Sequence, residues 1–114
     1  PGIPQVYYVG LLAGKNDLKL LEETKVGRNI NRHYYTKEEI DAEVKRPVVA
    51  ELLRMMEFRN AHPAFDGTFE LENSDDDKLV IVRRNGDAWA KLSADFKAKK
   101  FEITYTEDGE VRAF

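Results

Sequence analysis

The chain has 114 residues, of which 42% are hydrophobic, 34% are charged and none is cysteine, and its formal net charge at pH 7 is −3. This length and composition fit one globular domain, or the end of a larger protein, and exclude a chain that is disordered throughout. The near balance of acids and bases argues against general binding to nucleic acid or an anionic membrane, and the absence of cysteine excludes a disulfide scaffold, a thiol nucleophile and a cysteine zinc site.

The first residues of the chain and the lengths of its apolar runs indicate where in the cell the protein is located. The first residues lack a basic segment followed by an apolar one, and no window approaches the roughly 18–20 apolar residues of a membrane span. We therefore expect a cytoplasmic protein. The chain does not begin with Met, and we expect the start shown to be a cut point.

The first predicted element is the apolar run Ile3–Gly10, which is rich in Val and Tyr. A bounded run of this kind predicts a strand that is buried on both faces. Such a strand normally has parallel neighbours on both sides, yet no similar run follows until well past the middle of the chain. Either the partner strands lie outside this sequence or the run forms something else.

A polar loop is predicted over Leu11–Gly27, and a loop of that length is usually functional. Within it, Asp17 is a suitable cap for a short helix over Asp17–Glu23. Gly27 fits a turn or the end of a helix.

A dense group of basic, amide and aromatic side chains follows the loop: Arg28, Asn29, Asn31, Arg32, His33, Tyr34 and Tyr35. Planar donors beside aromatic walls are what recognition of sugar hydroxyls or an anion requires. The alternative is a loop that its arginines fix to the scaffold through carbonyl and carboxylate groups. From the residues alone, both interpretations stay open.

Two helices are predicted next. Thr36-Lys37-Glu38-Glu39 is a capping box, which predicts a helix from about Lys37 to Lys45. Pro47 either ends that helix or begins the following one. The strongest helical pattern is Pro47–Asn60, where apolar residues recur at intervals of three and four and give a wide apolar face.

A domain boundary is predicted near Phe65–Gly67, after which alternating segments are separated by turn signals. The predicted strands are Thr68–Glu72, Lys78–Arg84, Ala88–Asp95 and Lys99–Thr106. Asn85-Gly86 and Asp108-Gly109 are signals for two-residue hairpin turns. The second half is therefore predicted to be an antiparallel sheet of four or five strands.

Other candidate sites have weaker support. Asp75–Asp77 lacks the spacing of a calcium loop and is better interpreted as a solvated hairpin tip. His33 and His62 lack the spacing of a helical zinc site, so no metal ligand is assigned. No glycine-rich phosphate loop follows the first strand, so no cofactor is expected. Trp89 and Tyr105 could stack on a sugar, but core or cross-strand packing is the better interpretation.

Three segments carry a resemblance to a known family: GIPQVYYVGLLAG, GRNINRHYYTKEEI, and KRPVV with its following helix and FRNAHPAFDG. They resemble the C-terminal part of the sucrose phosphorylases and their close relatives in the alpha-amylase superfamily of glycoside hydrolases. The resemblance is nearly collinear over Gly2–Gly67 and is looser to about Thr104.

The resemblance implies an α+β fragment of a larger enzyme. Residues 1–66 would be the C-terminal end of a catalytic (β/α)8 barrel, with Ile3–Val9 as strand 8, Leu11–Tyr35 as the active-site loop and Pro47–Asn60 as helix 8. Residues 67–114 would be a C-terminal antiparallel β domain. The neighbours of the lone strand would then lie elsewhere in the parent protein, and the long loop would belong to the catalytic face.

The resemblance also implies a reaction. Enzymes of this family transfer a glucosyl unit, with retention, between the fructose of sucrose and phosphate to give alpha-glucose 1-phosphate. This needs two carboxylates about 5 Å apart, which the family carries on earlier strands. We therefore assign no catalytic residue, no metal and no cofactor, and expect the isolated chain to be inactive.

One substrate-binding residue is carried over from the resemblance. Arg28 matches the family's arginine at the bottom of the glucosyl pocket, where it pairs with an aspartate from an early strand. A guanidinium can bond a carboxylate and a sugar hydroxyl together. Arg32 and His33 are expected to fix the loop.

Two alternatives remain open at this point. The parent could be a related phosphorylase, hydrolase or transglucosylase with another acceptor, such as sucrose 6'-phosphate. The chain could also be a binding or assembly module without catalytic activity. The expected partners are sucrose, glucose 1-phosphate and phosphate in the parent enzyme, with no nucleic acid and no membrane, and a homodimer stays open as the assembly state.

Overall fold

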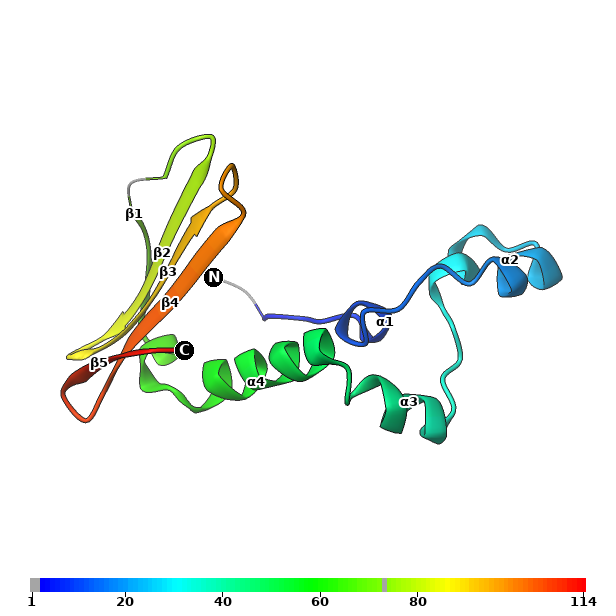
Figure 1. Cartoon of the computed structure of the whole chain (residues 1–114), viewed down its shortest axis with the longest axis horizontal. Helices are drawn as coiled ribbons and strands as arrows, with labels where there is room; N and C mark the ends of the chain where they lie inside the picture. Colours follow the sequence, from blue (N-terminus) through cyan, green and yellow to red (C-terminus); the bar gives the residue numbers. More distant parts are fainter. Residues whose placement is uncertain (1–2, 73) are drawn as a thin grey trace. The chain divides into compact units, whose positions relative to one another are not determined.

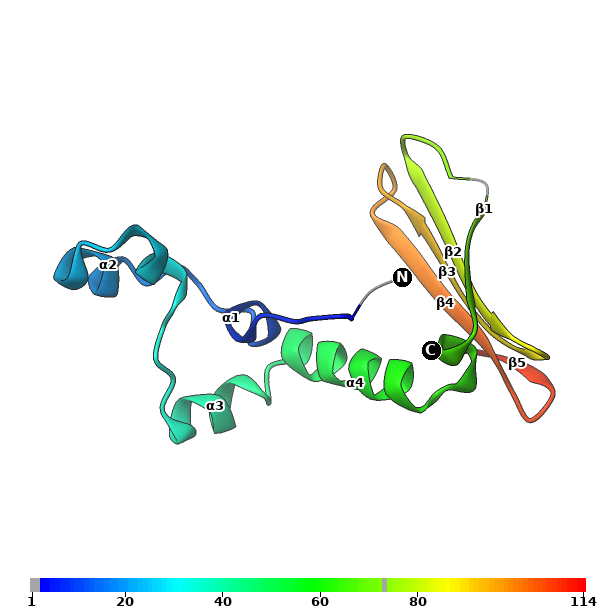
Figure 2. The same ribbon diagram turned by 180° about the vertical axis from the view of Figure 1, so that it is seen from behind.

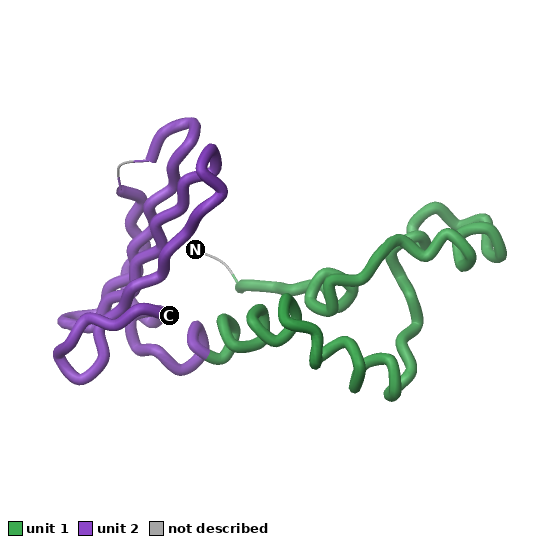
Figure 3. The backbone as a smooth tube through the Cα atoms, in the orientation of Figure 1, with its two compact units in different colours: residues 1–57 green, residues 58–114 purple. Residues whose placement is uncertain are grey.

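The computed structural model describes residues 3–72 and 74–114. It divides into two compact units, residues 1–57 and residues 58–114 (Figure 3). The division falls within the helix α4, Pro47–Ala61, because the end of that helix packs with the sheet of the second unit. The predicted boundary near Phe65–Gly67 lies further along the chain, and the assignment of residues 1–66 to a barrel stays a prediction.

The first unit contains short helices joined by irregular segments (Figures 1 and 2). In chain order they are α1 (Tyr8–Leu11), α2 (Leu18–Thr24), the 3₁₀ helix η1 (Gly27–Asn31), α3 (Lys37–Glu43) and the first turns of α4. Three buried residues, Val9, Leu12 and Val49, give the unit a small core. Arg46 donates hydrogen bonds to the main-chain oxygens of Leu12 and Ala13 (3.3 and 3.4 Å), which link α1 to the start of α4.

The predicted strand over Ile3–Gly10 is wrong for this chain. The described residues before α1 form no strand, and Tyr8–Leu11 is a single helical turn. Its amide groups bond locally, from Leu11 to the Tyr7 oxygen and from Leu12 to the Tyr8 oxygen (2.9 and 3.0 Å). A strand needs a neighbour for its amide and carbonyl groups, and within residues 3–72 and 74–114 none lies beside this run.

The helix starts in this unit follow the sequence signals. Asp17 caps α2 by accepting a hydrogen bond from the Leu20 amide (2.8 Å). The Thr36–Glu39 capping box forms in both directions, with distances of 2.7 and 3.2 Å, and α3 ends at Glu43. Pro47 is the first residue of α4. Its missing amide hydrogen costs nothing at that position, because the first-turn amides have no partner within the helix.

Of the two roles predicted for Gly27, a turn or the end of a helix, the structure does not use the second. The left-handed residue after α2 is Lys25, with φ 54°, and Gly27 instead begins η1.

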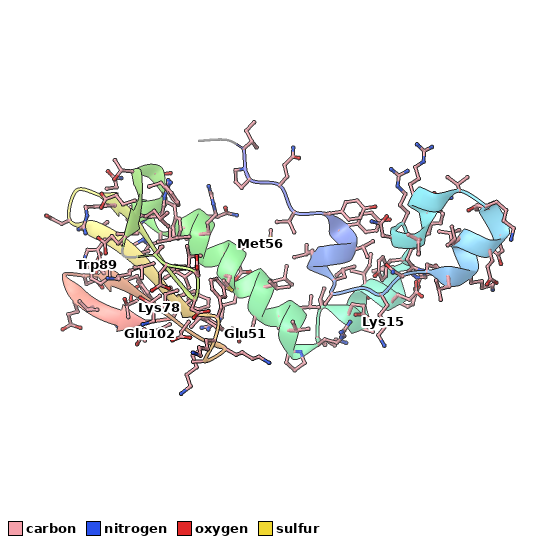
Figure 4. All side chains as sticks on the ribbon, turned by 90° about the horizontal axis from the view of Figure 1, so that it is seen from above. Lys15, Glu51, Met56, Lys78, Trp89 and Glu102 are labelled. Carbon is pink, nitrogen blue, oxygen red and sulfur yellow. The ribbon has the colours of Figure 1, made fainter. Side chains whose placement is uncertain are left out.

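In α4, Val49 is fully buried while Val48 is half exposed, so the apolar face is narrower than its pattern suggests. The side chains of Glu51 and Met56 both extend from this helix (Figure 4).

The second unit is a five-stranded antiparallel sheet in the order β1-β2-β3-β4-β5 (Figure 1). The strands are β1 (Thr68–Glu72), β2 (Lys78–Asn85), β3 (Ala88–Asp95), β4 (Lys100–Glu107) and β5 (Glu110–Ala113). Both predicted hairpins are present, but the first turn begins one residue after the start of the predicted Asn85-Gly86 pair. In the first, Asn85 pairs with Ala88, so the two-residue loop is Gly86-Asp87, with φ 58° at Gly86. In the second, Asp108 and Gly109 have φ of 53° and 80°, as a primed turn requires.

An aromatic cluster joins the end of α4 to this sheet. The Phe58 ring lies 4.7 Å from Tyr105, 5.5 Å from Phe65 and 5.2 Å from Phe114. Tyr105 is therefore a packing residue, as the sequence favoured over sugar stacking. Trp89 lies on β3 (Figure 4), where its amide donates to the hydroxyl of Thr106. None of the helices in the described ranges is long and apolar enough to cross a membrane.

Candidate functional site

The candidate site is the segment from Gly27 to Tyr35, which begins with η1. Arg28 lies in η1 and is exposed. Among the described residues, no side chain or main-chain oxygen accepts a hydrogen bond from its guanidinium. The five donors of the planar group therefore remain open to a ligand from outside this chain.

Local contacts hold the main chain around Arg28. The Asp17 amide donates to the Ile30 oxygen (2.6 Å), which ties the start of α2 to η1. The Asn29 side chain donates to the hydroxyl of Thr24 (3.0 Å) at the other end of α2. Both ends of α2 are thus bonded to the turn that carries Arg28.

His33 lies between two carboxylates from separate elements. Its Nδ1 is 2.7 Å from Asp17 Oδ2, and its Nε2 is 3.4 Å from Glu39 Oε1. The ring also meets Tyr35 edge to face at 4.6 Å. Only a third of the His33 side chain and a fifth of the Asp17 side chain are exposed, at 33% and 19%.

These contacts shift the pKa values of all three groups. The hydrogen bond to Asp17 raises the pKa of His33 above its usual value, and Glu39 adds to this against the effect of partial burial. The pKa of Asp17 is lowered by the bond from His33 and then by the Leu20 amide. The pKa of Glu39 is lowered first by the Thr36 amide and then by His33. The site thus favours a protonated imidazole between two ionised carboxylates.

Two tyrosines from the N-terminal run hold the end of the same segment. The Tyr7 hydroxyl donates to the Asn31 oxygen and the Tyr8 hydroxyl to the His33 oxygen, both at 3.1 Å. The two rings lie 4.8 Å apart. The sequence indicated a buried strand here and gave no signal for these two contacts, since they join residues far apart in the chain.

The structure divides the sequence-predicted cluster into two groups. His33 and the main chain of Asn31 take part in the contacts that fix the loop. Arg28, Arg32 and Tyr34 are exposed, and Arg32 donates no hydrogen bond to a described residue, so the loop-fixing role expected for it is not observed. Asp17 was expected only as a helix cap. Its second role as the partner of His33 depends on the folded loop.

A further fixed point lies at the start of the loop. A Cβ at Gly14 would meet the Tyr35 hydroxyl oxygen and Val9 Cγ1, so a larger residue there would force these two side chains to shift. Arg46 also forms an ion pair with Glu43.

Within residues 3–72 and 74–114, no group of three or more His, Asp or Glu side chains is arranged to hold a metal ion.

Comparison with known proteins gives close relatives, although no protein-family model matches the chain. Sucrose phosphorylase from Streptococcus mutans is 52% identical over 100% of the chain, and glucosylglycerol phosphorylase from Marinobacter adhaerens is 51% identical over 98%. Sucrose 6(F)-phosphate phosphorylase from Thermoanaerobacterium thermosaccharolyticum is 46% identical over 96%. The chain spans about a quarter of their length, at 24%, 24% and 23%.

A solved structure agrees with these matches. The crystal structure of sucrose 6F-phosphate phosphorylase from Thermoanaerobacter thermosaccharolyticum is similar to the whole chain, with a TM-score of 0.94 and 44% identity. The match covers 23% of that structure's chain and lies in its C-terminal region. The α+β fold class, with few helices and an antiparallel sheet, is confirmed.

Proposed function

We propose that this chain, which is homologous to the C-terminal region of the sucrose phosphorylases and their relatives, forms part of a retaining phosphorylase. Such an enzyme converts sucrose and phosphate to alpha-glucose 1-phosphate and fructose. The proposal rests on two observations taken together. The chain is homologous to these phosphorylases, and Arg28 is exposed on a turn that other residues hold in place. The barrel that would complete the active site, and its carboxylates, would come from the rest of the polypeptide.

In this proposal Arg28 binds the glucosyl unit. Its guanidinium can donate to a carboxylate and to a sugar hydroxyl at the same time, and charge-assisted bonds of this kind are stronger than neutral ones. The turn is already held through Asp17 and Asn29. A fixed turn loses little conformational freedom when sugar binds, which favours affinity.

A second candidate concerns the acceptor. The relatives are named for glucosylglycerol, sucrose and sucrose 6(F)-phosphate, and their identities to this chain lie close together, at 51%, 52% and 46%. A region that matches all three to a similar degree carries little of what separates their substrates. We therefore assign this chain to the shared glucosyl side of the reaction and leave acceptor choice to residues outside it.

An activity comparison tests the proposal. A complete polypeptide that contains this segment should release glucose 1-phosphate from sucrose and phosphate, and the panel should include sucrose 6'-phosphate and glucosylglycerol. The 114-residue chain alone should release none, because it lacks the proposed carboxylate pair. Release by the chain alone, or no phosphorolysis of any of the three glucosides by the complete polypeptide, would contradict the proposal.

A further inference from the structure

The His33 imidazole connects the first turns of two helices. On one side Asp17 uses Oδ1 to cap α2 and Oδ2 to bond His33. On the other side Glu39 uses Oε2 to accept from the Thr36 amide at the start of α3 and Oε1 to face His33. Each carboxylate thus joins a helix start to the same ring.

The turn that carries Arg28 lies within this connection. The Asp17 amide is bonded to the Ile30 oxygen of η1, so Asp17 holds η1 through its main chain and His33 through its side chain. Loss of the ring would remove the side-chain half of this support. The main-chain bond to Ile30 would then be the remaining direct link from Asp17 to the segment from Gly27 to Tyr35.

We propose that His33 is a positioning residue for Arg28, because it bridges Asp17 and Glu39 and so fixes the segment from which Arg28 extends. This inference rests on the proposed function, in which Arg28 binds the glucosyl unit. His33 itself touches no substrate in this account. Its effect on glucosyl transfer passes through Arg28.

The bridge requires the charged form of the ring. A neutral imidazole has one N–H and one acceptor nitrogen, whereas both ring nitrogens of His33 face carboxylate oxygens. Asp17 and Glu39 are the charged groups that face the ring, and Tyr35 packs against its side. Deprotonation would leave one of the two carboxylates without a donor, and the longer contact, to Glu39, would be lost first.

A double-mutant cycle in the complete polypeptide tests the proposal. His33→Ala should lower kcat/KM about 3- to 10-fold, mainly through a higher KM. Added to Arg28→Ala, it should cause little further loss, because its effect passes through the arginine. Additive losses would overturn the positioning role of His33 and leave the role of Arg28 intact. A silent Arg28→Ala would instead contradict the proposed function itself, and the positioning role with it.

Two conservative variants separate positioning from folding. His33→Asn keeps a donor near the position of Nδ1, facing Asp17, but none toward Glu39, so it should restore only part of the activity lost in His33→Ala. The effect of His33→Ala should also shrink as the pH rises past the titration of the histidine. Glu38→Gln, on the same turn of α3, is the control and should leave kcat/KM unchanged. An equal His33→Ala effect at acid and alkaline pH, or no rescue by Asn, would overturn the proposal.

Discussion

His33 makes the loop of the first unit depend on pH. Its folded-state pKa is raised, so the stabilisation that it gives is complete below about pH 6.5, the usual value for histidine, and is lost as the pH rises through the folded-state pKa. The pKa values of Asp17 and Glu39 are lowered. Their stabilisation is complete above about pH 4 and is lost as the pH falls through their folded-state values.

This gives a prediction for thermal unfolding. The His33→Gln variant should have a lower Tm than the wild type at pH 5.5, and the difference should shrink at pH 8.5. Circular dichroism at both pH values measures it. A Tm difference that is the same at both would mean that the charge of His33 does not stabilise the folded loop.

Gly67 gives a second prediction for a single residue. A Cβ there would lie 1.8 Å from the main-chain oxygen of Arg84, so the close approach of β1 to the end of β2 requires glycine. Gly67→Ala should lower the free energy of unfolding by about 1–3 kcal/mol. Gly10→Ala, where nothing lies within 4 Å of the added Cβ, is the matched control. Equal urea midpoints for the two variants would contradict the prediction.

Some helices and strands could be predicted from local sequence signals, whereas others depend on contacts between residues far apart in the chain. Period-two alternation and turn residues predicted the antiparallel sheet, because each strand pairs with a neighbour close in sequence. The start of α3 was predicted because Thr36 and Glu39 satisfy each other's amides locally. The run Ile3–Gly10 was not predicted correctly, because a strand needs a neighbour to pair with, and among the described residues no strand pairs with this run. The bridge from Asp17 to His33 was missed for the same reason.

The capping box of α3 gives a prediction for the stability of the first unit. Thr36→Ala removes the acceptor for the Glu39 amide and should destabilise the first unit by about 1 kcal/mol. Thr36→Ser keeps the hydroxyl and should cost much less. Urea unfolding followed by helical circular dichroism compares the two, and the prediction is wrong if both variants match the wild type.

Helix α4 contributes residues to both compact units, and Phe58 is the first residue of the second unit. Its ring is central to the aromatic cluster with Tyr105 and Phe114. The apolar spacing over Pro47–Asn60 predicted the helix that carries Phe58. It could not show that this residue packs on the sheet, because Tyr105 and Phe114 lie far along the chain.

Truncation of that ring should therefore disrupt the sheet unit. Phe58 is half-buried, so Phe58→Ala should lower the free energy of unfolding of this unit by about 2 kcal/mol, less than for a fully buried phenylalanine. Phe101→Ala is the control, since that side chain is 69% exposed and should cost far less. Tryptophan fluorescence of Trp89 reports on the sheet during urea unfolding. Similar losses in the two variants would contradict a stabilising role for the Phe58 ring in the sheet unit.

Steady-state kinetics of the complete polypeptide test most directly whether Arg28 holds the glucosyl unit. Arg28→Ala should lower kcat/KM for phosphorolysis about 10- to 100-fold, the loss expected for one charge-assisted hydrogen bond, with the Tm unchanged. Arg32→Ala, an exposed arginine on the same loop, should change it less than about threefold. Wild-type kinetics in Arg28→Ala would contradict the proposed role of Arg28 in binding the glucosyl unit.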